Sequence, residues 1–154
     1  CKFAHDLYLD AIQKSKEKTK KCSKKIMLLS LEKELSKVKN DYDNEEIIAF
    51  LEGKIHPLME SSVKIEGSVT DTSNLWPSTL RDMTKSLDLN CDTLDNHDTK
   101  IGRLVGVRND IAHGEKMTIA SLSELEKYED AALIVMHELA FEVLDAIEQK
   151  RYLA

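Results

Sequence analysis

Apolar positions along the chain recur mostly at the three- and four-residue steps of α-helices. One such stripe predicts a single long helix over residues 3–39. Within it, residues 14–25 hold seven lysines and little apolar content, so we expect the helix to project beyond the core or to bend there. The stripe consists of Phe3, Leu7, Ala11, Cys22, Ile26, Leu29 and Leu35.

A second helix is expected after Asp43 or Asn44, either of which can cap it, with Glu45 and Glu46 in its first turn. Pro57 should end or kink this helix. Residues 61–77 are rich in small polar residues and predict irregular structure, with a short extended piece around Val63 to Val69. The expected buried face of the second helix is Ile47, Ile48, Leu51 and Ile55.

The C-terminal half predicts three further helices. The first runs from Leu75 to Leu87 and is opened by Pro77 or Ser78. The second runs from about Asp95 to His113, with Asp92 or Asp95 as its cap and Gly114 as its stop. The third spans residues 122–149 behind a Ser121–Glu124 capping box. Its core positions are Leu125, Tyr128, Ala132, Val135, Leu139 and Val143. We therefore expect an all-α, up-and-down helical bundle forming a single domain over residues 1–154.

Composition agrees with a helical protein, because glycine and proline number only 5 and 2. The three cysteines are odd in number and widely spaced, which argues against a disulfide framework and a zinc site and favours a reducing cytoplasm. No apolar run is long enough to cross a membrane, and no membrane partner is expected. No cofactor or metal is expected either.

Charge is distributed unevenly. The whole chain has a net charge of −6, but residues 1–40 carry +6 and residues 41–154 carry −12. The lysine run is therefore either a solvated helix face or a track for an RNA backbone. In the second interpretation the RNA-binding candidates are Lys14, Lys18, Lys21, Lys24 and Lys25.

The most informative segment is IGRLVGVRNDIAHGE, residues 101–115. On a helix, Arg108 falls within an apolar stripe, where an unpaired guanidinium would be very costly to bury. Arg108 should therefore pair with an acid, or its end of the stripe should face a cleft or a subunit interface. The stripe comprises Ile101, Leu104, Val105, Ile111 and Ala112.

A second face of the same helix carries Gly102, Gly106, Asn109 and His113. Two glycines within five residues of a helix suggest close packing, for example against the same helix of a second copy. His113 lies at the carbonyl end of the helix dipole, which favours its imidazolium form and suits a proton-transfer role. Arg108 offers a fork of donors that fits a phosphate. These groups suit RNA cleavage by the adjacent 2′-hydroxyl, unless Arg108 merely pairs with a core acid and His113 merely caps the helix.

Residues 108–113, RNDIAH, are similar to the R-x(4–6)-H signature of HEPN domains, and LVGVRNDIAHGE resembles the RiboL-PSP-HEPN and MAE_28990-like branch. The likeness is good over residues 75–150 and rests on helical character alone in the N-terminal half. It implies a metal-independent endoribonuclease, typically a toxin or phage-defence effector that dimerises. Arg108 and His113 would be catalytic, Asn109 would orient them, and Asp110 and Glu115 would be helpers.

The resemblance also implies RNA as substrate, a homodimer, and an antitoxin protein as a further partner, and the glycine face predicts that the homodimer packs on Gly102 and Gly106. One departure concerns the antitoxin. HEPN toxins silenced by nucleotidyltransferases often carry a tyrosine two residues after the histidine, whereas this chain has Glu115. An antitoxin that modifies tyrosine is therefore not expected. The alternative function is a catalytically inactive HEPN module that binds a protein partner or RNA.

Overall fold

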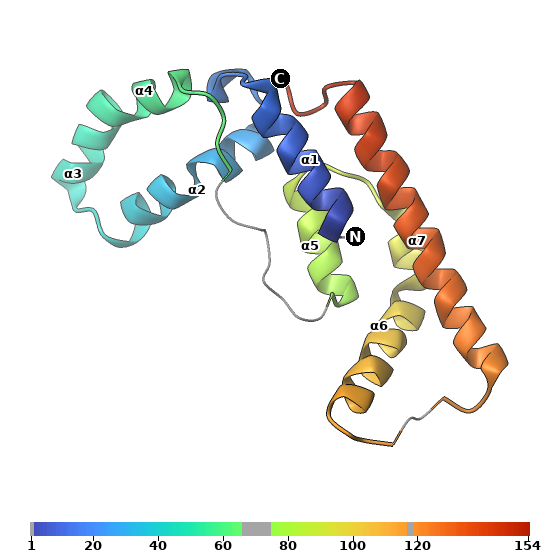
Figure 1. The fold of residues 1–154 in the computed structure, drawn as a ribbon. Coiled ribbons are helices and arrows are strands. Elements are labelled where there is room, and N and C mark those ends of the chain that lie inside the picture. The colour runs from blue at the N-terminus through green and yellow to red at the C-terminus, as the bar shows by residue number, and fades with distance from the viewer. Residues whose placement is uncertain (1, 66–74, 117–118) are drawn as a thin grey trace.

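The computed structural model describes residues 2–65, 75–116 and 119–154, and these residues form an all-α fold (Figure 1). A 3-10 turn, η1, joins α1 to α2, and a π-helical turn, η2, joins α3 to α4. The elements are α1 (Lys2–Ser15), η1 (Thr19–Lys21), α2 (Lys24–Asn40), α3 (Asn44–Ala49), η2 (Phe50–Lys54), α4 (Ile55–Glu60), α5 (Pro77–Ser86), α6 (Asp92–Ala112) and α7 (Leu122–Glu148).

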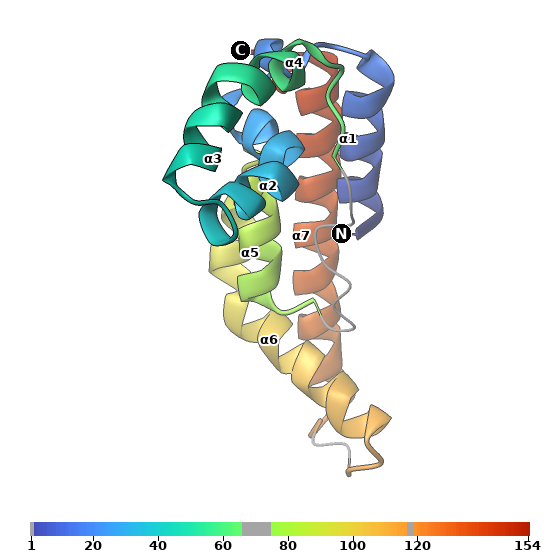
Figure 2. The same ribbon diagram turned by 90° about the vertical axis from the view of Figure 1, so that its left-hand side faces the viewer.

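The longest helix, α7, organises the bundle. It packs antiparallel to α6 along one side and beside α1 along the other, and α5 packs against α6 (Figures 1 and 2). Helices α2 to α4 extend to one side of this group as a smaller lobe. Burying one apolar stripe per helix against its neighbours gives a single cluster of buried side chains. Its centre includes Tyr8, Ile12, Leu94, Ile101, Val135, Leu139 and Val143.

The single long helix expected over residues 3–39 is wrong. Helix α1 ends at Ser15, Lys16 adopts a left-handed backbone with φ of 53°, and the chain restarts as α2 behind the N-cap Ser23. Residues distant in the sequence hold the connection between α1 and α2. The N–H of Thr19 donates to the carbonyl of Ser61 at 2.9 Å. The N–H of Ser23 likewise donates to the carbonyl of Tyr152 at 2.8 Å. These long-range hydrogen bonds hold a turn in a segment whose local composition favours a continuous helix.

The second expected helix begins as predicted, since Asp43 and Glu46 form a complete capping box. Its buried face is different. Phe50 is the buried residue of this segment, while Ile48 and Leu51 are more than half exposed. The π-helical turn η2 widens the helix just before Pro57, and α4 ends three residues after that proline. Ile47 and Ile55, also expected on the buried face, are half-buried.

Over the first residues of the expected extended piece, Val63 and Ile65 are buried outside any helix. Residues 66–69 of that prediction lie outside the described residues. Helix α5 begins at Pro77 as predicted. No helix in the described ranges has the length and apolar character needed to cross a membrane.

Helix α6 begins earlier than predicted, at Asp92, and neither Asp92 nor Asp95 caps it. The cap comes from α7 instead. A carboxylate oxygen of Glu138 accepts hydrogen bonds from the Thr93 N–H at 3.0 Å, the Thr93 hydroxyl and the Cys91 thiol at 3.2 Å. Burial and this carboxylate raise the pKa of Cys91 to about 12. A helix N-terminus whose free N–H groups meet an acid from another helix is both capped and fixed in place.

Candidate active site

The RNDIAH motif forms the last turns of α6, at the end of the bundle where α6 and α7 extend past α1 and α5 (Figure 1). The helix stops with a complete Schellman motif. The N–H of Glu115 donates to the carbonyl of Asp110 at 2.8 Å, and the N–H of Gly114 donates to the carbonyl of Ile111 at 3.1 Å. Gly114 has φ of 75°, so the predicted stop is confirmed at this residue.

The apolar stripe of α6 is buried only in its first half, so the end that holds Arg108 lies at the surface of the described chain. Ile101 is buried and Leu104 and Val105 are half-buried, but Ile111 and Ala112 are exposed. The burial of the stripe decreases along α6 because α6 has 21 residues and extends beyond the ten-residue helix α5 that packs against it. The side chain of Arg108 is exposed, and its expected pairing with an acid, or its place at a cleft or a subunit interface, stays a prediction.

The motif side chains lie around the exposed end of α6. His113 is the exposed C-cap residue, with φ of −92° and ψ of 6°, and its N–H donates to the Asn109 carbonyl at 2.9 Å. Asn109 and Asp110 are half-buried, and Glu115 is exposed. Because residues advance by about 100° on a helix, Arg108 and His113 are separated by about 140° of rotation. Asn109 and His113 share one side of α6, and Arg108 points to another.

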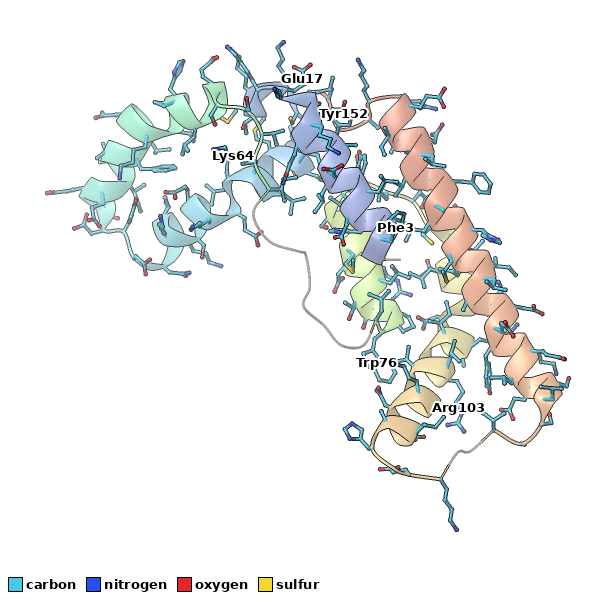
Figure 3. All side chains as sticks on the ribbon, viewed as in Figure 1. Phe3, Glu17, Lys64, Trp76, Arg103 and Tyr152 are labelled. Carbon is cyan, nitrogen blue, oxygen red and sulfur yellow. The ribbon has the colours of Figure 1, made fainter. Side chains whose placement is uncertain are left out.

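Two residues beside the motif were not identified from the sequence. Tyr128 on α7, expected in the core, is only half-buried and donates from its hydroxyl to a Glu124 carboxylate oxygen at 2.5 Å. Arg103 on α6 hydrogen-bonds the same tyrosine (its position is labelled in Figure 3). The hydrogen bond from Tyr128 lowers the pKa of Glu124, aided by the Ala120 N–H and the charge of Arg103. This network ties the start of α7 to α6 and so supports the helix end that carries the motif.

The capping box predicted at the start of α7 forms in part. The Ser121 hydroxyl accepts from the Glu124 N–H at 3.2 Å, as expected. The Glu124 carboxylate reaches one residue further back and accepts from the Ala120 N–H at 2.9 Å. Both bonds hold the chain that returns from the motif to α7.

The two glycines of α6 have different surroundings. A Cβ atom at Gly102 would lie 3.9 Å from the ring of Pro77, so this glycine packs against the start of α5. A Cβ atom at Gly106 would meet nothing within 4 Å in the described part of the chain. Gly106 therefore faces open space about two turns before His113. Packing against a second copy at this position remains a prediction.

The lysine candidates lie far from the motif. Residues 21–23 pair with residues 152–154 beyond the C-terminal end of α7, whereas the motif adjoins its N-terminal end (Figure 3 labels Glu17 and Tyr152 at one end and Arg103 near the other). Helix α7 has 27 residues, which corresponds to about 40 Å. Four of the five candidates form ion pairs, namely Lys14 with Asp10, Lys18 with Glu60, Lys21 with Glu17 and Lys25 with Asp88. An RNA that contacts both regions of one chain would have to span this length.

The acidic, histidine and cysteine side chains of the described residues do not gather into a metal site. Within residues 2–65, 75–116 and 119–154, no three His, Cys, Asp or Glu side chains lie close enough together to hold a metal ion. Cys22 and Cys91 are free thiols, the first buried and the second half-buried.

Comparison with known proteins places the motif in a family. No curated protein and no solved structure matches the chain. The profile of the HEPN_MAE_28990-like HEPN family matches residues 1–152, which include both the motif and the whole N-terminal half. The match therefore covers nearly all of the helical bundle, and it extends the resemblance well beyond residues 75–150. The chain belongs to the HEPN_MAE_28990-like HEPN family.

Proposed function

We propose that this protein is a metal-independent endoribonuclease whose active centre is the exposed end of α6. The observation that carries the proposal is the RNDIAH motif, displayed on the surface of a chain that belongs to a HEPN family. HEPN membership supports a nuclease or RNA-related function. The exposure of Arg108 and His113 leaves both side chains accessible to a large polyanion.

In the proposed reaction, Arg108 binds the scissile phosphate through its guanidinium fork and stabilises the charge of the phosphorane. His113 takes the proton of the 2′-hydroxyl and delivers a proton to the leaving 5′-oxygen, and Asn109, on the same side of α6, orients the substrate or the imidazole. The 2′-oxygen attacks the adjacent phosphorus, and the bond from phosphorus to the 5′-oxygen breaks. The products are a 2′,3′-cyclic phosphate and a 5′-hydroxyl, so no water is consumed in this step.

Asp110 and Glu115 have a supporting role in this proposal. Their main-chain hydrogen bond closes α6 directly around His113. Both side chains are carboxylates, which would oppose the negative charge of a bound phosphate. We therefore assign them to positioning of the helix end rather than to phosphate binding.

A homodimer completes the proposed site. The rotation of about 140° between Arg108 and His113 makes it difficult for one straight helix to direct both groups at one phosphate. A two-fold dimer packed on Gly106 brings Arg108 of one copy towards His113 of the other. The open space beside Gly106 supports this arrangement.

The direct test is RNA cleavage in the presence of EDTA. Purified protein should cleave total RNA, and His113→Ala or Arg108→Ala should lower the rate at least ~100-fold while the circular dichroism spectrum stays helical. His137→Ala is the matched control, since His137 is an exposed histidine on α7 outside the motif. If folded wild-type protein leaves RNA intact, the inactive binding module becomes the better description.

The proposed biological role is that of a toxin or phage-defence effector. Expression should slow bacterial growth, and Arg108→Ala should relieve the effect. An antitoxin of such a toxin would have to act without the tyrosine that this chain replaces by Glu115. Normal growth during expression of active nuclease would contradict the toxin role without contradicting the nuclease.

A further inference from the structure

The outer face of α7 carries an apolar surface that the bundle leaves uncovered. We call it the α7 patch and define it as Leu133, Ile134, Met136, Phe141 and Leu144. These five side chains are between 44% and 73% exposed. Leu133, Met136, Ala140 and Leu144 follow one another at steps of three, four and four, so they align along the helix. His137 is the one exposed polar side chain of α7 between Leu133 and Leu144.

The α7 patch is not an unburied edge of the core. The core residues of α7 are Ala131, Val135, Leu139, Val143 and Ala146, all less than 3% exposed. Taking about 100° per residue, these positions centre on the side of α7 roughly opposite to Leu133 and Leu144. Helix α7 is therefore apolar on two opposite faces over residues 131–146. Such a helix is normally covered on both sides.

Acidic residues border the α7 patch at both ends. Glu126, Glu129 and Asp130 precede Leu133 on the same face, and Glu148 follows Leu144 one turn later. All four are exposed, and Lys127 is the one lysine or arginine of α7. The surface therefore has an apolar centre between two acidic ends.

We propose that the α7 patch is the docking site for a cationic amphipathic helix of another protein. Charge complementarity selects this occupant. A basic residue at each end of an apolar helix would meet Glu126, Glu129 and Asp130 at one end and Glu148 at the other.

The other occupants fit less well. An α7-to-α7 contact between two copies places acidic ends beside acidic ends when the helices are parallel, and again when they are antiparallel, because both ends are acidic. A nucleic acid would meet acidic and apolar groups in place of the cations that phosphates require. The same repulsion disfavours an anionic membrane surface.

The spacing of the apolar and acidic residues on α7 predicts the length and the residue pattern of the partner helix. Residues 126–148 span about 33 Å along the helix, and the α7 patch itself spans about 17 Å. The partner helix therefore has about 22 residues, with apolar residues at three- and four-residue steps in its middle and Lys or Arg in its first and last turns. The motif end of α6 stays outside this contact, so docking and RNA cleavage use separate surfaces.

The proposal can be tested with two synthetic 22-residue peptides. Both have leucines at helical spacing in the middle, and their terminal turns carry lysines in one peptide and glutamates in the other. The wild-type chain should bind the lysine peptide more tightly. Phe141→Ser should weaken that binding about 30-fold, as for a central aromatic anchor, while Leu28→Ser, at an exposed leucine of α2, should have no effect. The double variant Glu129→Lys, Asp130→Lys should shift the preference towards the glutamate peptide.

Several results would overturn the proposal. These are equal binding of both peptides, no binding of either, or binding that Phe141→Ser leaves unchanged. A wild-type dimer that Phe141→Ser converts to a monomer would assign the α7 patch to a second copy. A loss of RNA affinity in Phe141→Ser would assign it to nucleic acid. Because Phe141 is 73% exposed, its replacement should leave the thermal stability unchanged, which checks that the variant is folded.

Discussion

The main-chain N–H of Glu115 donates a hydrogen bond of 2.8 Å to the carbonyl of Asp110, and this bond closes α6 around His113. It forms because Gly114, between them, takes up a left-handed backbone with φ of 75°. The position of the proposed catalytic histidine therefore depends on a glycine that contacts no substrate.

Gly114→Ala should destabilise the fold by about 1–2 kcal/mol, because an L-residue with a side chain is strained in the left-handed region. Urea denaturation followed by circular dichroism measures the change. Gly53→Ala is the control, since Gly53 lies in the π-helical turn and a Cβ atom there meets nothing within 4 Å in the described chain. Equal effects of the two substitutions would show that the conformation of Gly114 is unimportant.

Glu138→Ala should cost about 1–3 kcal/mol of stability, because it removes the acceptor for the Thr93 N–H at the start of α6. Glu126→Ala, at an exposed glutamate of the same helix, should change the stability by no more than about 0.5 kcal/mol. Chemical denaturation of the two variants makes the comparison. A Glu138 variant as stable as the Glu126 variant would mean that the α6 N-terminus does not need its cap.

His5 should make the protein sensitive to mild acid. Burial lowers the pKa of His5, an effect that Asp6 only partly opposes, and its Nε2 atom has no hydrogen-bond partner in the described structure. Between its lowered folded pKa and about 6.5, the unfolded chain binds a proton that the folded chain does not. The free energy of unfolding should therefore fall as the pH drops below about 6.5.

The measurement is urea denaturation between pH 7.5 and pH 5, with variants at two histidines. His5→Leu should flatten the pH dependence, because it removes the imidazole that titrates. Leucine suits the site because the side chains around His5 are mainly apolar and include Leu80, Met83 and Leu139. His56→Gln, at an exposed histidine, should retain the wild-type slope. A His5→Leu variant with the wild-type slope would place the acid sensitivity elsewhere.

Gly106→Leu should abolish the dimer and the nuclease activity together, because a side chain would fill the open space at the proposed interface. Light scattering and RNA cleavage of the same sample test this, and Gly53→Leu controls for adding a leucine to a helix. A fully active monomer would contradict the dimeric site.

Mixing two inactive variants tests whether the site is shared between copies. If Arg108 of one copy works with His113 of the other, a refolded mixture of Arg108→Ala and His113→Ala chains should recover about a quarter of the wild-type activity. This follows because half of the dimers are mixed and each holds one intact pair. No recovery would mean that each chain uses its own Arg108 and His113.

Local signals predicted much of the fold. Asp43, Pro77, Ser121 and Gly114 each mark a helix end through their own side chain or backbone preference, and each is found near the predicted boundary. The wrong prediction of a continuous helix through Lys16 has a different origin. The turn there is stabilised by Ser61 and Tyr152, which are more than 40 and 130 positions away in the sequence, and no local pattern reports such contacts.

The candidate site likewise has features that local sequence predicts and features that it does not. The motif and its place at a helix end follow from residues 108–114 alone. The exposure of Arg108 does not, because it depends on α5 being shorter than α6. The contact of Arg103 with Tyr128 depends on how α6 and α7 align. The cap that Glu138 provides depends on which residue of α7 faces the start of α6. These relationships belong to the packing of whole helices.

The most direct test of the proposed function is the chemistry of the cut. An RNA oligonucleotide cleaved in EDTA should yield a 2′,3′-cyclic phosphate and a 5′-hydroxyl by mass spectrometry, and a single 2′-deoxynucleotide on the 5′ side of the cleaved bond should block cleavage there and nowhere else. His113→Ala should remove the reaction, and His137→Ala should not. Cleavage that persists at the deoxy position, or products that carry a 5′-phosphate, would contradict attack by the 2′-hydroxyl and with it the role proposed for Arg108 and His113.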